Sequence, residues 1–270
     1  MKYKLFISDY DGTLGVAPEN NIDSETLEAI NKFIDKGGIF VVCSGRETHS
    51  ITKILNKCAF KGLVASLQGA KINDIESGET IFAGGLSTEK ALEAISAVEY
   101  SGLVPLFYHN GKMYYKEYNG YIDVYEKAVG IKGVVSDVKK EIVRLNDTIS
   151  KICWLGEDGL VNKTAKELNE KYHGKGLKFN SGAPCLLEAI NPECSKGNAV
   201  RFIADYYNVP LEQVITVGDS TNDIDLLVGP WHGVAVGDGK DELKAVADEI
   251  TLPFEQKPIK FLLEKYCLND

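Results

Sequence analysis

Two carboxylates spaced two residues apart, Asp9 and Asp11, directly follow the short apolar run Leu5–Ser8. At a separation of a few ångströms, two such charges repel by about 1–4 kcal/mol at effective dielectric constants of roughly 80 to 20. A hard divalent cation with oxygen ligands, such as Mg²⁺, offsets that repulsion. Gly12 permits a tight turn after the pair, and the Thr13 hydroxyl can hold a carboxylate rotamer. An ordinary Asp-Gly turn is the alternative for this segment taken alone.

A second acidic loop follows another apolar run nearer the C-terminus. The run Val214–Val217 leads into Gly218, Asp219 and the stretch that ends at Asp223. If the two apolar runs are neighbouring strands, Asp219 and Asp223 can reach a metal held near Asp9, because open parallel sheets bind ligands at the carboxyl ends of their strands. The alternative is a strand-to-helix turn in which an Asp or Ser caps the helix, and both interpretations can hold together.

Two further positions could bind an anion. Ser44 and Gly45 follow the apolar run Ile39–Cys43, and a hydroxyl with free backbone N–H groups at a helix start suits a phosphate. Lys196 lies just before a predicted helix, where its ammonium could face a phosphate and the carboxylates around it. Taken singly, a loop serine and a surface lysine are the simpler interpretations of these two positions.

The elements that must position these residues alternate between strands and helices. Strands are predicted at 5–8, 39–43, 62–67, 214–217 and 234–236, and helices at 24–36, after residue 46, at 198–207 and at 241–247. Continuous apolar runs suit strands that are covered on both faces, and the alternation is typical of a parallel sheet between helical layers. We therefore predict an α/β fold with a Rossmann-like parallel sheet in a three-layer αβα core.

The pattern changes between residues 84 and 184, where alternating stretches rich in tyrosine replace the apolar runs. A strand is predicted at 112–116, helices at 88–100 and 158–172, and glycine-bearing joints at Gly84-Gly85 and Gly182-Ala183-Pro184. We therefore predict an α+β domain over 84–184, inserted into a discontinuous core formed by 1–83 and 185–270. Two modest domains also agree with a length of 270 residues.

The composition is that of an acidic globular protein. The formal net charge is −9, and no basic face of the kind that nucleic-acid binding requires is visible. The six cysteines include no C-x-x-C pair, and the four histidines show no zinc spacing. The first apolar run is too short for a signal peptide and no run approaches a membrane span. We therefore expect a cytoplasmic protein with unpaired cysteines, no nucleic-acid partner and no membrane partner.

The four signals occur in a fixed order, which makes them far more specific together than singly. They are Asp9-Tyr10-Asp11-Gly12-Thr13, Ser44-Gly45-Arg46, Lys196-Gly197 and Gly218-Asp219-Ser220-Thr221-Asn222-Asp223. The sequence thereby resembles the haloacid dehalogenase superfamily, and the insert between the second and third motifs resembles its Cof-like subfamily with a large α+β (type IIB) cap. One departure is Gln68-Gly69-Ala70, where that subfamily usually has Asn-Gly-Ala.

The resemblance implies a role for each matched acid. Asp9 is the nucleophile that becomes an aspartyl phosphate. Asp11 is the general acid that protonates the leaving alcohol, and afterwards the base that takes a proton from water. Mg²⁺ is held by the Asp9 carboxylate, the Asp11 carbonyl and Asp219. Asp223 holds the waters of the metal or orients Lys196.

The resemblance further implies that Ser44, the Gly45 amide, Asn222 and Lys196 bind the phosphate. The expected activity is Mg²⁺-dependent hydrolysis of a small-molecule phosphomonoester, a sugar phosphate or similar, with the insert as a cap that reads the leaving group. A phosphomutase of the same superfamily and a non-catalytic phosphate-binding protein stay open as alternatives, whereas a dehalogenase would need neither Asp11 nor a metal. The sequence does not identify the substrate, the cap residues that select it or the oligomeric state.

Overall fold

The protein folds into two compact units. The computed structural model describes residues 1–15, 21–58, 60–109, 111–183 and 185–268. Unit 1 comprises Met1–Phe82 and Ser195–Asp270, and unit 2 comprises Ala83–Cys194. The insert was expected to end at residue 184, which lies outside the described residues, but strand β11 (Leu186–Ile190) pairs with strands of unit 2. The predicted second boundary is corrected accordingly, and the core resumes at Ser195.

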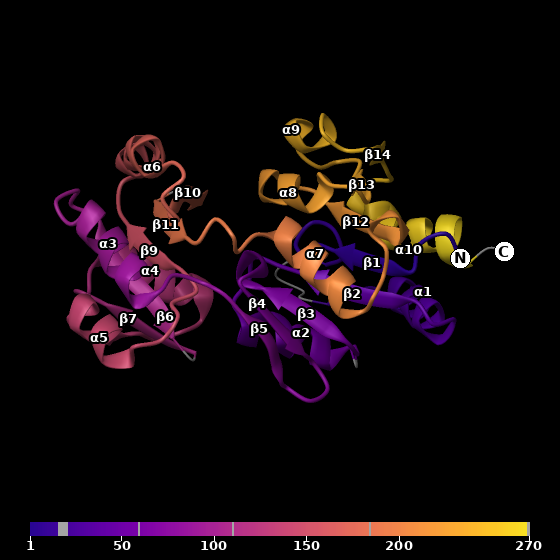
Figure 1. The fold of residues 1–270 in the computed structure, drawn as a ribbon, viewed down its shortest axis with the longest axis horizontal. Helices are drawn as coiled ribbons and strands as arrows, with labels where there is room; N and C mark the ends of the chain where they lie inside the picture. Colours follow the sequence, from indigo (N-terminus) through magenta and orange to yellow (C-terminus); the bar gives the residue numbers. More distant parts are fainter. Residues whose placement is uncertain (16–20, 59, 110, 184, 269–270) are drawn as a thin grey trace. The chain divides into compact units, whose positions relative to one another are not determined.

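Unit 1 is built on an eight-stranded sheet (Figure 1). Its strands are β1 (Leu5–Ser8), β2 (Ile39–Cys43), β3 (Leu63–Ser66), β4 (Lys71–Asp74), β5 (Thr80–Ala83), β12 (Val214–Gly218), β13 (His232–Ala235) and β14 (Glu249–Ile250). The strand order is β14-β13-β12-β1-β2-β3-β4-β5. Neighbours from β14 to β3 run parallel, and β4 runs antiparallel to β3. The parallel sheet predicted from the apolar runs is confirmed.

Helices cover both faces of this sheet. They are α1 (Ser24–Asp35), α2 (Thr48–Lys57), α7 (Lys196–Tyr206), α8 (Ile224–Leu227), α9 (Asp241–Lys244) and α10 (Pro258–Leu263), with 3₁₀ turns at Leu67–Gly69, Leu211–Gln213, Thr221–Asp223 and Phe254–Gln256 and a π-helical turn at Glu264–Leu268. Alternate residues of β1 point to opposite faces. Phe6 packs in the cluster that contains Phe33 of α1, and Ile7 in the cluster that contains Ile203 of α7. The three-layer αβα core is therefore confirmed.

Unit 2 is a smaller α+β assembly around a six-stranded sheet (Figure 1). Its remaining strands are β6 (Val104–His109), β7 (Lys112–Tyr115), β8 (Val134–Val135), β9 (Ile152–Leu155) and β10 (Lys178–Ala183), and its helices are α3 (Thr88–Val98), α4 (Gly120–Val129), α5 (Val138–Leu145) and α6 (Asp158–Tyr172). The order is β10-β11-β9-β6-β7-β8, and within it β7 and β8 run parallel. Hydrophobic clusters lie on both faces of this sheet.

Helices α4 and α5 are absent from the predictions made for unit 2. Helix α4 is preceded by the N-cap Asn119, whose side chain accepts from the Ile122 N–H at 3.0 Å, and followed by the C-cap Gly130 with φ +70°. Both caps are local helix signals. The tyrosines and β-branched residues between them are typical of strands and obscure the helical period.

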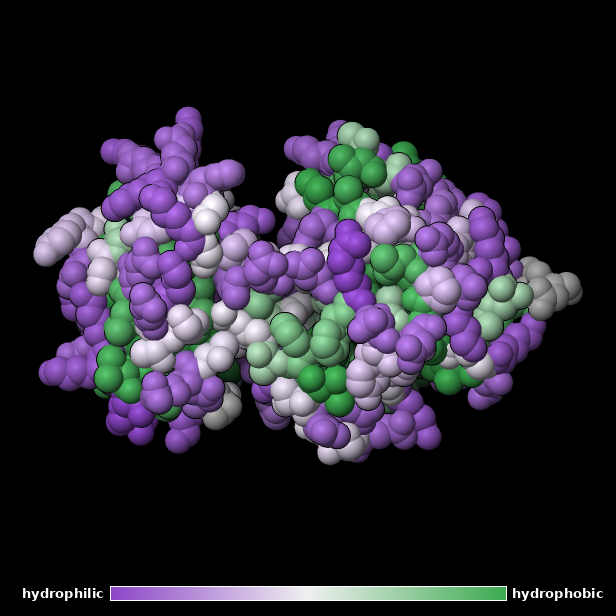
Figure 2. All heavy atoms as spheres, viewed as in Figure 1, coloured by the Kyte–Doolittle hydropathy of each residue, from purple (hydrophilic) through white to green (hydrophobic). Residues whose placement is uncertain are grey.

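The described residues present a largely hydrophilic face in Figure 2, and their cysteines are unpaired. Within the described ranges, no helix is both long enough and apolar enough to cross a bilayer. Hydrophilic side chains are spread over both units on the face shown in Figure 2. All six cysteines, each of which is described, are free thiols.

Candidate active site

The first acidic motif and the second acidic loop lie at the carboxyl edge of two neighbouring strands. β1 pairs in parallel with β12, with Ser8 opposite Val217. The ladder continues one step further, because the Asp9 N–H donates to the Val217 carbonyl at 2.9 Å. Asp9 and Asp219 therefore leave the sheet at the same edge, which is where open parallel sheets bind ligands.

Lys196 supplies a buried positive charge between two carboxylates at this edge of the sheet. It opens α7, whose N-cap Ser195 accepts from the Asn198 N–H, and its ammonium is fully buried. The Nζ atom lies 2.6 Å from Asp9 Oδ1 and 2.5 Å from Asp223 Oδ1. Burial alone lowers the pKa of a lysine, but the charges of Asp9 and Asp223 outweigh it and raise the pKa of Lys196 above its ordinary value. The lysine therefore stays charged and holds the two carboxylates in place.

Three carboxylates form one cluster. Oxygens of Asp9, Asp219 and Asp223 all lie within 4.8 Å of one another, and Thr13 Oγ1 donates to Asp219 Oδ1 at 3.0 Å. Burial and the charge of Asp223 raise the pKa of Asp9 to about 8, although Lys196 opposes the rise. Burial likewise raises the pKa of Asp219 to about 6. One lysine does not balance these acids, and a donor set made only of oxygen fits a hard divalent cation such as Mg²⁺.

The local backbone fixes the acidic loop. Asp223 Oδ2 accepts from the N–H groups of Asp219 at 3.2 Å and of Ser220 at 3.1 Å, while Oδ1 accepts from Lys196. Both oxygens of Asp223 are thus held by the protein itself. Gly12 has φ +80°, and a Cβ there would lie 2.6 Å from Asp219 Oδ2. Only glycine fits between the two acidic loops at this position.

Arg46 is a site residue to which the sequence analysis assigned no role. Its Nε donates to Asp11 Oδ2 at 2.7 Å and its Nη2 to Asp11 Oδ1 at 2.6 Å, a bidentate pair. Its guanidinium also lies 5.1 Å from the centroid of the Tyr10 ring. The side chain of Asp11 therefore points to Arg46, and it is not a member of the three-carboxylate cluster. The place of Arg46 beside Ser44 and Gly45 was the signal that could have indicated it.

The predicted phosphate-binding loop lies against Gln68. Ser44 is fully buried, and its Oγ accepts from the Arg46 N–H at 3.1 Å. Gln68 adopts a left-handed backbone, with φ +60°, and its N–H donates to the Ser44 carbonyl at 3.1 Å. A Cβ on Gly45 would lie 2.6 Å from Gln68 Nε2. Gln68, at which the sequence departs from the subfamily that it resembles, thus packs on Gly45, and its buried Oε1 has no hydrogen-bond partner among the described residues.

The structure brings some of the predicted site residues into one cluster and places the others on neighbouring loops. Lys196 contacts Asp9 and Asp223 directly, and an oxygen of Asp219 lies within 4.8 Å of oxygens of both acids. Ser44 and Gly45 follow β2, the strand next to β1. Asn222 is exposed in the 3₁₀ turn Thr221–Asp223.

Several known proteins are similar to this chain along most of its length. The family model for haloacid dehalogenase-like hydrolases matches residues 6–261. Phosphatase YwpJ of Bacillus subtilis is 25% identical over 287 residues, which cover 97% of this chain and 99% of that protein. The 5-amino-6-(5-phospho-D-ribitylamino)uracil phosphatase YwtE of the same organism is 23% identical over 285 residues, 97% of each chain. The solved structure of the HAD subclass IIB sugar phosphatase BT4131 shares the fold, with a TM-score of 0.79, 19% identity and coverage of 98% and 99%.

Proposed function

The chain belongs to the haloacid dehalogenase-like hydrolases and is a phosphatase, and we propose that it hydrolyses a small-molecule phosphomonoester with Mg²⁺ and with Asp9 as its nucleophile. The observation that carries this proposal is the buried ammonium of Lys196 between Asp9 and Asp223. It holds the Asp9 carboxylate in one orientation and supplies positive charge where a phosphoryl group would transfer. The names of two similar proteins, a phosphoribitylaminouracil phosphatase and a sugar phosphatase, support a small phosphorylated metabolite as the substrate.

The proposed reaction consists of two displacements at phosphorus. A carboxylate oxygen of Asp9 bonds to phosphorus as the bond to the substrate's alcohol oxygen breaks, and Asp11 gives its proton to that oxygen. Water then attacks the aspartyl phosphate, Asp11 takes a proton from it, and the bond between phosphorus and Asp9 breaks to release phosphate. Because Arg46 occupies both carboxylate oxygens of Asp11, each proton transfer requires at least one of these hydrogen bonds to open.

The acidic cluster provides the residues for a metal. Asp9, Asp219 and the backbone carbonyl of Asp11 would hold Mg²⁺. Bound there, the ion supplies positive charge to the phosphoryl oxygens. Asp223, whose oxygens are held by Lys196 and by backbone N–H groups, positions the lysine and the loop.

The remaining predicted residues would bind the phosphate oxygens. The Ser44 hydroxyl and the Gly45 N–H follow β2, and Asn222 is exposed one residue before Asp223. All of these groups come from unit 1. We propose that unit 2, the inserted domain, supplies the preference among substrates.

The test is a panel of phosphate esters assayed for phosphate release with and without Mg²⁺. We expect Mg²⁺-dependent release, and we expect Asp9→Asn to abolish both turnover and the covalent phosphoenzyme seen by mass spectrometry while the fold survives. Unchanged turnover in Asp9→Asn would refute the nucleophile. Recovery of an isomeric phosphate ester in place of free phosphate would identify a phosphomutase instead.

A further inference from the structure

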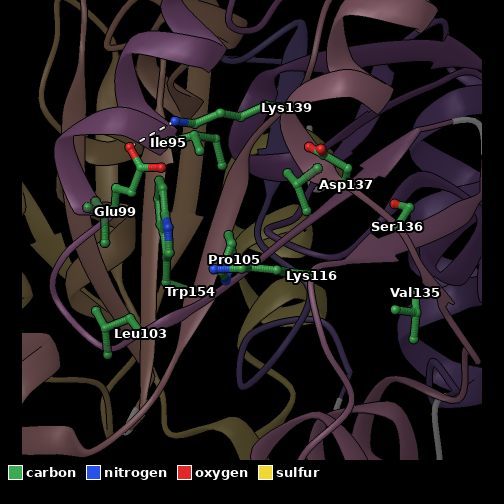
Figure 3. A pocket seen from close by; sticks show the side chains of 12 residues that line it. Ile95, Glu99, Leu103, Pro105, Lys116, Val135, Ser136, Asp137, Lys139 and Trp154 are labelled. Atoms are coloured by element: carbon green, nitrogen blue, oxygen red, sulfur yellow. Dashed lines mark hydrogen bonds and ion pairs between the residues drawn. The ribbon is translucent and has the colours of Figure 1, made fainter.

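A cavity of about 570 Å³ opens in unit 2, within the size range of small-molecule sites (Figure 3). Its walls come from the end of α3, the start of α5 and the strands β6 and β9. All of its lining residues belong to unit 2, whereas the residues proposed for phosphoryl transfer all belong to unit 1. The proposed reaction therefore does not account for this cavity.

The floor of the cavity is one row of side chains across four strands. Trp154 of β9 lies opposite Pro105 of β6, and the Lys116 N–H donates to the Pro105 carbonyl at 3.2 Å. The Ser136 N–H donates to the Tyr115 carbonyl at 2.9 Å, which extends the parallel ladder of β7 and β8 by one residue. Paired residues in a ladder place their side chains on the same face of the sheet. Trp154, Pro105, Lys116 and Ser136 therefore form a row, and all four line the cavity.

One side of the cavity is apolar. Ile95 and Val98 from the last turns of α3, Leu103 after that helix and Val138 at the start of α5 are all buried and line it. Trp154, at the end of the row, adds an aromatic ring between Ile95 and Leu103 (Figure 3). Such a surface suits a flat or branched apolar group.

The charged residues of the cavity differ in what they contact. Lys139 Nζ lies 2.9 Å from Glu99 Oε2, and the Asp137 carboxylate accepts from the Lys140 N–H at 3.2 Å as the cap of α5. By contrast, no carboxylate of the described residues lies within 4.0 Å of the Lys116 ammonium. Glu99 thus pairs with Lys139 and Asp137 caps α5, whereas the solvent-exposed Lys116 has no carboxylate partner among the described residues.

A second polar group in the row also lacks a partner. The Oγ of Ser136 is buried and has no hydrogen-bond partner among the residues that the structure describes. An unsatisfied buried hydroxyl is costly unless something binds it. Ser136 and Lys116 occupy paired positions at the end of the β7–β8 ladder, so their side chains leave the sheet on the same face.

We propose that this Lys116 cavity binds a small molecule that carries an aromatic or branched apolar body and a single carboxylate. The apolar body lies against Trp154 and α3, and the carboxylate accepts from Lys116 and Ser136. A doubly charged phosphate group suits the site less, because Glu99 and Asp137 also line it and would repel the second charge. The ligand class is therefore distinct from the phosphate esters proposed for unit 1.

The experiment uses the full chain labelled with 5-fluorotryptophan and observed by ¹⁹F NMR. The chain has two tryptophans, and Trp231 lies in unit 1, so its signal is an internal control that a Trp231→Phe variant assigns. We expect phenylacetate to shift the Trp154 signal saturably and to leave the Trp231 signal unchanged. Phenylacetamide, which has the same body without the charge, should bind about tenfold more weakly, as should benzylphosphonate.

Two lysine variants test the contact itself. Lys116→Met should weaken phenylacetate binding about tenfold, and Ser136→Ala should weaken it to a smaller extent. Lys112→Met is the matched control, since Lys112 begins β7, is exposed like Lys116 and does not line the cavity. An absent Trp154 shift, equal affinity for the acid and the amide, tighter binding of benzylphosphonate, or equal losses in Lys116→Met and Lys112→Met would each overturn the proposal. Thermal midpoints of the variants show that they fold, and no readout depends on phosphatase activity.

Discussion

Each unit buries a lysine against carboxylates, but the two arrangements differ in net charge. In unit 2, Lys151 contacts Glu188 in one pair, and although burial lowers the pKa of Lys151, the charge of Glu188 raises it overall. In unit 1, Lys196 contacts both Asp9 and Asp223, and Asp219 adds a further acid nearby. The pair in unit 2 is neutral by itself, whereas the cluster in unit 1 carries an excess of negative charge. The unbalanced charge, and not the buried lysine, therefore indicates the site.

The largest effect expected from this difference follows Lys196→Met. The variant should lose at least about 10³-fold in kcat/KM, because the positive charge beside the nucleophile is removed. It should also lose about 3–5 kcal/mol in the free energy of unfolding, because Asp9 and Asp223 are left buried without their counter-charge. Steady-state kinetics and urea denaturation measure the two losses separately.

A double variant separates catalysis from stability at the same position. Adding Asp223→Asn to Lys196→Met removes one of the orphaned charges and should restore part of the stability, but none of the activity. If the double variant recovered activity with its stability, Lys196 would be a structural residue like Lys151. That outcome would remove the contrast between the two units.

The second prediction concerns the excess acid itself. Asp219→Asn should weaken Mg²⁺ binding by about a hundredfold, because ligand charge sets the affinity of an oxygen site for a hard cation. Mg²⁺ titration by calorimetry and the Mg²⁺ dependence of phosphate release both measure this change. Asp241→Asn, at a fully exposed acid of α9, is the control and should leave both unchanged. Equal Mg²⁺ affinity in the two variants would contradict the assignment of the cluster as a metal site.

The sequence predicted those parts of unit 1 in which local pattern and position agree. Continuous apolar runs predicted β1, β2 and β12, and an acid directly after two of them predicted which groups would meet at one edge of the sheet. The contact between Asp11 and Arg46 could not be predicted, because it joins loops after different strands and depends on where two side chains point. Local pattern carries no information about such a direction.

Unit 2 was harder to predict for a related reason. β11 is a short, mostly apolar strand, and only its antiparallel pairing with β9 and β10 assigns it to the insert. The cap residues of α4 were visible, but its strand-like composition concealed the helix. The row of Trp154, Pro105, Lys116 and Ser136 in the cavity floor depends on the register of four strands. The sequence alone does not specify that register.

The third prediction tests the neutral pair of unit 2. Lys151→Met should lower the free energy of unfolding by about 2 kcal/mol, less than Lys196→Met, because the Lys151 and Glu188 side chains keep 17% and 10% of their surface exposed. The double variant Lys151→Met/Glu188→Leu should recover most of that loss, since an apolar pair can replace a neutral buried ion pair. Urea denaturation measures both. A double variant as unstable as the single one would show that Glu188 also stabilises the fold through another contact, such as the one that it accepts from the Cys153 thiol.

The smallest effect is expected at an exposed ion cluster of unit 1, where solvent screens the charges. Glu25 of α1 contacts Lys257 and Lys260 of the α10 segment, with Lys260 Nζ at 2.7 Å, and these lysines lower the pKa of Glu25 from 4.5 to about 2. A carboxylate with a lowered folded-state pKa stabilises the fold above its ordinary pKa, and the contribution is lost as pH falls toward the folded value. The stability difference between the wild type and Glu25→Gln should therefore be constant above about pH 5, shrink between about pH 4.5 and 2, and vanish below that range.

Thermal midpoints of the wild type and Glu25→Gln, measured over this pH range, test the sign of the effect. In about 1 M NaCl, where the screening length is about 3 Å, the difference should shrink at every pH. A difference that is insensitive to both pH and salt would mean that Glu25 stabilises the fold through packing. The expected distinction between screened, exposed charges and buried charges would then not hold for this cluster.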